Sequence, residues 1–178
     1  KGSITAHGGH GYGGAIALTE EDDTLDQWSI GNDFSIIDSD FISNVAQGGR
    51  GSDSHNLNPE GVNQELGGNG GNAFGGAVYS PAWSISPSIT RCTIQHNKAL
   101  AGVAGSPHSA ENRAYSLGGA IYSFRVSLQD SELEFNLASV SNHSDASSPS
   151  PSSVASQTIV SGGAVYSLID FESTNCTM

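Results

Sequence analysis

The apolar residues of this 178-residue chain fall into short clusters that recur and are separated by long polar stretches. The phrase "GGAVYS" occupies residues 75–80 and returns at 162–167, "GGAIYS" occupies 118–123, and a weaker copy, "GGAIAL", occupies 13–18. Each copy leads into a run in which apolar and polar positions alternate. No window sustains an apolar period of 3.6 residues, so the pattern predicts short β-strands and little helix.

A second phrase follows each Gly-Gly-Ala phrase. It runs through an apolar residue, a small residue, a second apolar residue, Asn and Ala at fixed spacing. The copies are "IIDSDFISNVA" (36–46), "ITRCTIQHNKA" (89–99) and "LQDSELEFNLA" (128–138). The incomplete "FESTNCTM" is aligned from Phe171, which places Cys176 in the column of the second apolar residue and an Asn directly after Met178.

Paired phrases with variable connections predict an all-β fold, a right-handed parallel β-helix of about four coils with long variable loops. The coils start near residues 13, 75, 118 and 162, and residues 1–178 form a single β-helix segment. A coil cannot bury its apolar face alone, whereas stacked copies of one phrase bury it against each other. The expected inward columns are Ile16, Val78, Ile121 and Val165, and Phe41, Ile94, Leu133 and Cys176.

Three further features of the phrases have predicted roles in this stack. Gly-Gly permits a positive φ or a tight corner before the strand. Asn44, Asn97 and Asn136 are expected to stack with their side-chain amides hydrogen-bonded to one another and to adopt the left-handed conformation. Tyr79, Tyr122 and Tyr166 are expected to form an aromatic ladder, for which ring stacking is preferred over sugar binding.

Composition narrows the possible partners. The chain carries a net charge of −12 with six Lys and Arg in all. Nucleic acid is therefore not expected as a partner, because binding it requires clustered positive charge. No apolar run approaches the length of a membrane span, so we expect no membrane insertion by this segment. Both ends of the sequence read as the interior of a repeat, which predicts a segment of a longer protein.

The phrases resemble the repeats of the chlamydial polymorphic membrane proteins and related microbial surface proteins, in which GGA[IV]Y alternates with FxxN. "GGAVY" (75–79 and 162–166), "GGAIY" (118–122) and "FISN" (41–44) match this pattern. "IQHN" and "LEFN" replace Phe by another apolar residue, and "GGAIA" lacks the Tyr. The resemblance covers the repeat cores and not the loops. It implies an extracellular β-helix, often a surface-exposed passenger involved in adhesion.

Two features raise calcium binding as an alternative. The run "TEEDDTLDQW" concentrates acidic side chains, but it lacks the spacing of a calcium loop, so a solvated loop is the preferred interpretation. "GGNGGNAF" (67–74) is similar to a calcium-binding nonapeptide but has Asn72 in place of the Asp. No cofactor is expected, with Ca²⁺ as the one alternative. The weak metal candidates are Glu20, Glu21, Asp22, Asp23 and Asp26.

Catalysis is the main alternative, because polysaccharide-cleaving enzymes also use this fold. Such sites need paired carboxylates, or Ca²⁺ with a cationic base, on adjacent coils. Outward carboxylates are expected at Asp38, Asp40, Asp130 and Glu132. The second coil carries Thr90 and Thr93, so these carboxylates do not lie on neighbouring coils and no catalytic residue is assigned.

The remaining candidates are single residues. His7 and His10 suit metal binding only with a partner elsewhere, and surface polar residues are the preferred interpretation. Asn142 and Asn175 begin N-glycosylation sequons. Cys92 and Cys176 are expected two coils apart, too far for a disulfide.

The sequence therefore predicts a non-enzymatic, structural or adhesive β-helix segment, extracellular or at the cell surface. It would serve as a passenger, stalk, filament or coat component that presents variable loops. The expected partners are further coils of the same protein, other copies, and host or matrix glycans or proteins. The alternatives are a polysaccharide-active enzyme, either a lyase or a hydrolase, and a calcium-dependent surface module.

Overall fold

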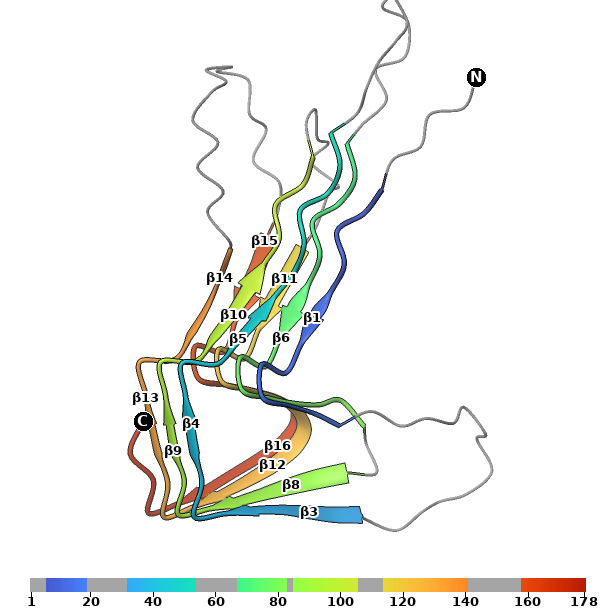
Figure 1. The fold of residues 1–178 in the computed structure, drawn as a ribbon. Helices are drawn as coiled ribbons and strands as arrows, with labels where there is room; N and C mark the ends of the chain where they lie inside the picture. The colour runs from blue at the N-terminus through green and yellow to red at the C-terminus, as the bar shows by residue number, and fades with distance from the viewer. Residues whose placement is uncertain (1–5, 19–31, 54–66, 83–84, 106–113, 141–157) are drawn as a thin grey trace, which may run out of the picture.

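The computed structural model describes residues 6–18, 32–53, 67–82, 85–105, 114–140 and 158–178. These residues form short strands that wind through successive coils (Figure 1). Coil 1 holds β1 (Gly11–Tyr12), β2 (Ile16–Ala17), β3 (Asn32–Ile37), β4 (Asp40–Ile42) and β5 (Val45–Gln47). Coil 2 holds β6 (Ala73–Phe74), β7 (Val78–Ser80), β8 (Ile85–Thr90), β9 (Thr93–Gln95) and β10 (Lys98–Ala101). Coil 3 holds β11 (Ala114–Leu117), β12 (Ile121–Gln129), β13 (Glu132–Glu134) and β14 (Leu137–Val140). Coil 4 holds β15 (Thr158–Ser161) and β16 (Val165–Thr174).

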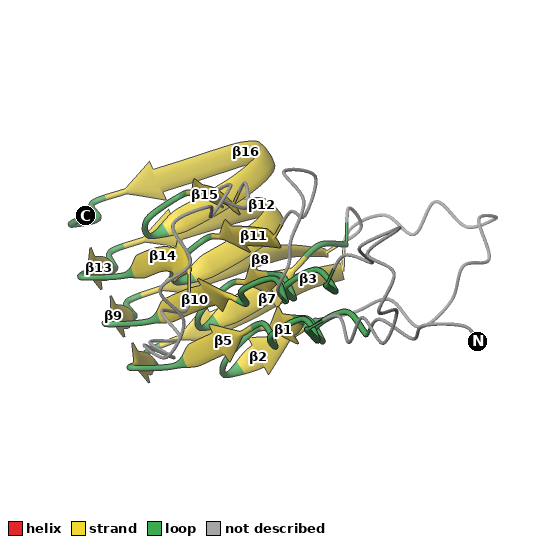
Figure 2. Ribbon diagram, turned by 90° about the horizontal axis from the view of Figure 1, so that it is seen from above, coloured by secondary structure: helices red, strands yellow, loops and turns green. Residues whose placement is uncertain are grey.

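Equivalent strands of successive coils pair in parallel, as the repeat predicts. The sheets run β1-β6-β11-β15, β4-β9-β13, β5-β10-β14 and β2-β7-β12-β8-β3, with β16 against β12. Figure 2 shows the coils as layers in chain order. Seen from coil 1 in Figure 1, the chain turns clockwise as it recedes, so the fold is a right-handed parallel β-helix.

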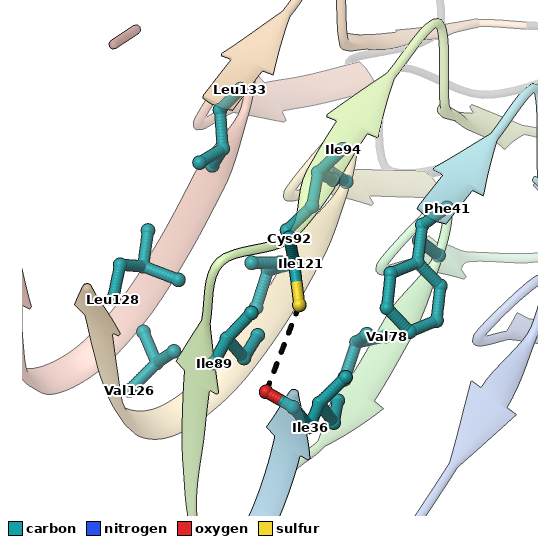
Figure 3. Packing of buried hydrophobic residues seen from close by; sticks show 12 residues of the cluster. Ile36, Phe41, Val78, Ile89, Cys92, Ile94, Ile121, Val126, Leu128 and Leu133 are labelled. Atoms are coloured by element: carbon teal, nitrogen blue, oxygen red, sulfur yellow. Dashed lines mark hydrogen bonds between the residues drawn. The ribbon is translucent and has the colours of Figure 1, made fainter. Parts of the chain in front are cut away.

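The predicted apolar columns form the core. Val78 and Ile121 are fully buried, with Ile16 and Val165 packed against the same cluster. Phe41, Ile94 and Leu133 form the second column, as predicted. Figure 3 shows side chains of both columns, among them Val78, Ile121 and Phe41, within one core. The Cys92 thiol donates to the Ile36 carbonyl oxygen at 3.7 Å.

The expected register of coil 4 is wrong by two residues. The expected alignment of Phe171 with Leu128 requires one residue fewer in β16 than in β12. The structure instead has one more, a bulge between the pairs Ser123–Ser167 and Arg125–Asp170, so that Phe171 lies opposite Val126. Cys176 therefore enters the column of Cys92 rather than that of Leu133. Side chains alternate with a period of two, so a two-residue slip preserves the inward and outward pattern and cannot be seen in the sequence.

The two glycines of each Gly-Gly-Ala phrase have different roles. The first has a positive φ, from 44° to 65° at Gly13, Gly75, Gly118 and Gly162. The second faces the next coil: a Cβ at Gly76 would lie 1.9 Å from the carbonyl oxygen of Gly119. One glycine therefore makes the corner, and the other permits close stacking.

The left-handed corners differ from expectation. The ladder asparagines were expected to adopt this conformation, but the preceding residues do so: Ser43, His96 and Phe135 have φ of 58°, 57° and 54°. The other corner carries a second left-handed column at Asp38, Arg91, Asp130 and Asn175. The bend thus occurs one residue before each Asn, which leaves the Asn side chain directed inward.

A feature that sequence analysis missed extends the β-helix at one edge. Segments 6–10, 48–53, 67–72 and 102–105, which we call the glycine arm, run on from β5 and β10 and into β1 and β6 (Figure 1). Their lateral hydrogen bonds recur every three residues: the amides of Gly8 and Gly11 donate to the carbonyls of Asn69 and Asn72. Three residues per turn is the repeat of a polyproline II helix, which has no internal hydrogen bonds.

Neighbouring segments of the glycine arm also pair in opposite directions. The Gly49 amide donates to the Gly9 carbonyl, and the Ser52 amide donates to the Ala6 carbonyl. Side chains are excluded from the interior, because a Cβ at Gly8 would lie 2.0 Å from the Gly49 oxygen. The arm is thus held by backbone hydrogen bonds and by close contact between glycines.

Candidate functional site

The predicted aromatic ladder is present and is larger than expected. Tyr79 and Tyr122 stack with centroids 5.5 Å apart at 21°, and Tyr122 and Tyr166 stack at 5.5 Å and 5°. Tyr12 lies 4.7 Å from Tyr79, and Phe74 lies 5.1 Å from Tyr122. These additional rings come from β1 and β6, just before the Gly-Gly phrase, so an aromatic residue followed by Gly-Gly was the available signal.

The ladder lies at the surface with its rings partly covered. Tyr12 is 43% exposed, whereas Tyr79, Tyr122 and Tyr166 are half-buried. Burial, with smaller contributions from the neighbouring Tyr12 and Tyr122, raises the pKa of the Tyr79 phenol to about 12. Burial and Tyr166 likewise raise the pKa of Tyr122. The phenols of Tyr79 and Tyr122 therefore remain protonated and neutral at ordinary pH.

The predicted asparagine ladder is confirmed. The Nδ2 of Asn44 donates to Oδ1 of Asn97 at 2.9 Å, and the Nδ2 of Asn97 donates to Oδ1 of Asn136 at 3.0 Å. The same oxygens accept the backbone amides of Asn44 and Asn97 at 3.0 Å. Asn97, fully buried, also donates to the Phe41 carbonyl. Each amide thereby satisfies polar groups on two coils.

A second polar column joins the coils within the glycine arm. His7 and His10 accept the backbone amides of Asn69 and Asn72 at Nδ1, each at 2.9 Å. One coil further on, Oδ1 of Asn72 accepts the amide of Tyr115 at 2.9 Å. The histidines and Asn72 thus bond to the next coil of the stack.

The carboxylates considered for catalysis lie on the surface around one corner. The Arg91 guanidinium makes a two-contact ion pair with Asp38 at 2.6 and 2.7 Å, which lowers the pKa of that carboxyl. Oδ1 of Asp130 accepts from Nδ2 of Asn175 at 3.0 Å. Arg91, and not the expected Thr90, therefore lies in the corner column between the two aspartates, because Thr90 pairs with Ile37.

The carboxylates of the adjoining sheet follow the same arrangement. Asp40 and Glu132 occupy one outward column of β4, β9 and β13, with Thr93 between them. Among the described residues, no two of the four candidate carboxylates occupy neighbouring coils of one column. A shallow polar depression follows this corner over coils 2 to 4, and its lining includes Arg91, Thr93, Asp130, Glu132, Asn175 and Thr177.

The other candidates are only partly covered by the structure. The acidic run holding Glu20, Glu21, Asp22, Asp23 and Asp26, and the sequon at Asn142, lie outside the described residues. Within the described ranges, no three His, Cys, Asp or Glu side chains gather as metal ligands would. Asn175 is exposed, at the corner where it contacts Asp130. Both cysteines are free thiols, with Cys92 buried and Cys176 partly buried.

The described part of the chain contains no helix that is long and apolar enough to cross a membrane. Its surface features are the aromatic ladder, the polar corner and the glycine arm. No family model, curated protein or solved structure matches the chain.

Proposed function

We propose that this chain is a non-enzymatic β-helix segment of an extracellular or cell-surface protein, with a structural or adhesive role. The observation that carries the proposal is the register of the stack. In every sheet, equivalent residues of successive coils lie opposite one another, as Ile16, Val78 and Ile121 do. A molecule that repeats the same contacts along one axis is suited to act as a rod or spacer.

The contacts between coils support this role. The asparagine ladder and the close approach of the second glycines recur from coil to coil. Each coil is thus stabilised mainly by its neighbours, and further coils would extend the same arrangement. The partners that fit this geometry are more coils of the same protein or other copies of it.

The glycine arm supports the presentation of loops. The connection from coil 1 to coil 2 leaves the arm after residue 53 and rejoins it at residue 67, and the connection from coil 2 to coil 3 leaves it after residue 105 (Figure 1). The arm is fixed by backbone hydrogen bonds, so these connections leave from a defined support away from the core. Variation in the loops can then alter recognition of host or matrix glycans or proteins without altering the stack.

The corner carboxylates favour this role over polysaccharide cleavage. Glycosidic hydrolysis requires two carboxyl groups on either side of one bond. Here Asp38 is paired with Arg91, and Asp130 is bonded to Asn175. Both aspartates link consecutive coils at the left-handed corner, which is a structural use of these side chains.

The first test is to incubate the protein with acidic polysaccharides and to measure newly formed ends of the polysaccharide chains. The second is to screen the immobilised protein for binding to matrix glycans and proteins. We expect no cleavage, and retention of a glycan or protein if the role is adhesive. Cleavage that disappears in the Asp130→Asn variant, with the fold retained by circular dichroism, would contradict the proposal and favour the enzyme.

A further inference from the structure

The neighbouring tyrosine rings place oxidisable phenols on consecutive coils. Tyr12, Tyr79, Tyr122 and Tyr166 occupy coils 1 to 4 in order, and neighbouring ring centroids lie 4.7, 5.5 and 5.5 Å apart. We propose that this ladder is a site of oxidative cross-linking, in which neighbouring tyrosines couple to dityrosine and covalently join the coils. The inference is independent of the proposed surface role.

The chemistry requires a one-electron oxidant, such as hydrogen peroxide acting through a haem peroxidase. Each of two phenols gives up one electron and one proton, forming a phenoxyl radical. The radicals couple through the carbons ortho to their oxygens, forming a C–C bond. The hydrogen on each joined carbon then moves to the oxygen, which restores both phenols. Two tyrosines and one peroxide give one dityrosine and two waters.

The geometry favours coupling within the stack. Tyr122 and Tyr166 belong to β12 and β16, which pair in register, so their backbones hold the rings side by side. Their ring planes are nearly parallel, at 5°, with centroids 5.5 Å apart. Holding two reacting groups next to each other makes their encounter intramolecular and removes much of its entropic cost.

Exposure along the ladder identifies where oxidation begins. Tyr12 is 43% exposed and is the most accessible phenol of the four. It lies 4.7 Å from Tyr79, which stacks on Tyr122. An oxidant that reaches Tyr12 therefore meets the end of a continuous series of rings. Phe74 packs among these rings but has no phenol, so it takes no part in the coupling.

The cross-link would reinforce the weakest direction of a solenoid. Hydrogen bonds and apolar contacts hold coil to coil, and a bond between Tyr122 and Tyr166 would add a covalent tie across β12 and β16. Such a tie restricts the unfolded chain as a disulfide does. We expect the oxidised protein to melt at a higher temperature than the untreated protein.

The chain supplies its own control tyrosine. Tyr115 on β11 is half-buried, as three of the four ladder tyrosines are, but it contacts no other aromatic ring among the described residues. Coupling that depends only on accessibility would therefore include Tyr115. Coupling that depends on stacking would omit it.

The experiment treats the dilute, complete chain with a haem peroxidase and hydrogen peroxide and maps cross-linked peptides of the monomer by mass spectrometry. We expect Tyr12–Tyr79, Tyr79–Tyr122 and Tyr122–Tyr166 peptides. The two links that involve Tyr122 should be lost in Tyr122→Phe, and all yields should be unchanged in Tyr115→Phe. Phe retains the ring, and circular dichroism confirms folding of each variant. Links that map to Tyr115, links that form only between molecules, or no dityrosine at all would overturn the proposal. The same pattern of links in urea-unfolded protein would also overturn it.

Discussion

Asn44 and Asn97 lie on consecutive coils, and the Nδ2 of Asn44 donates to Oδ1 of Asn97 at 2.9 Å. Asn97 repeats the contact toward Asn136 at 3.0 Å. The central Asn97 is fully buried and makes hydrogen bonds in both directions along the stack, whereas Asn44 is bonded on one side. Asn97 should therefore contribute more than Asn44 to the free energy of unfolding.

Replacing Asn97 by Ala should lower the free energy of unfolding by about 2–4 kcal/mol, because it leaves buried amides and carbonyls on the adjacent coils unsatisfied. Asn44→Ala removes contacts on one side and should cost about 1 kcal/mol. Urea denaturation of both variants provides the measurement. Equal losses at the two positions would show that the ladder does not join the coils as described.

The glycine arm allows a matched pair of substitutions. A Cβ at Gly8 would lie 2.0 Å from the Gly49 carbonyl oxygen, whereas a Cβ at Gly9 would meet nothing within 4 Å. Gly8→Ala should therefore destabilise the arm by about 3 kcal/mol through overpacking, while Gly9→Ala is tolerated. Hydrogen exchange at the Gly49 and Gly71 amides reports the effect. Similar exchange in both variants would argue against close packing in the arm.

The hydrogen bond to His10 can be tested by placing Asn at position 10, because an Asn makes the equivalent hydrogen bond on the next coil. Asn72 accepts the Tyr115 amide through Oδ1, as His10 accepts the Asn72 amide through Nδ1. His10→Asn should therefore preserve stability, and His10→Ala should lose about 1 kcal/mol. Protection of the Asn72 amide, measured by NMR, should fall in the Ala variant alone. Loss of protection in both variants would mean that the imidazole ring, not its acceptor, holds the segment.

The raised pKa of the Tyr79 phenol predicts that the folded protein loses stability at alkaline pH. The pKa of this phenol is about 12 in the folded state against an ordinary value of 10.0, so folding favours the neutral form. This contribution is fully present below about pH 10 and is lost as the pH rises toward 12. Melting temperatures measured from pH 8 to 12 should fall more steeply for the wild type than for Tyr79→Phe. Parallel curves for the two proteins would contradict this prediction.

Much of the fold could be predicted from the sequence because the stack repeats its own residues. The columns of Val78 and Ile121, and of Asn44 and Asn97, follow directly from aligned phrases. Pairing of coil 4 could not be predicted, because the aligned phrases require one residue fewer in β16 than in β12, whereas the structure has one more. The resulting difference of two residues leaves the inward and outward alternation unchanged.

The glycine arm was missed for a different reason. Strands and helices are recognised by periods of 2 and 3.6. The glycines of the arm recur instead with a period of three, as at Gly8 and Gly11 or at Gly68 and Gly71. Glycine-rich stretches also resemble flexible loops in composition. The lateral hydrogen bonds that order these stretches join distant parts of the chain. The glycine spacing within one segment therefore does not show which segments pair. The aromatic surface was likewise predicted only in part. The tyrosine ladder could be predicted from the repeated phrase, but the additional rings from β1 and β6 could not, because they lie outside that phrase.

The most direct test of the stacking is a thiol placed between the two native cysteines. The structure puts Ser131 next to Cys176 on the adjacent coil, because Glu132 pairs with Thr177. Adjacent coils are about 4.8 Å apart, within reach of a disulfide. In a Cys92→Ser background, peptide mapping after mild oxidation should find Ser131→Cys linked to Cys176, and Leu133→Cys unlinked. A link from position 133 instead, or a Cys92–Cys176 disulfide in the wild type, would contradict the described stack.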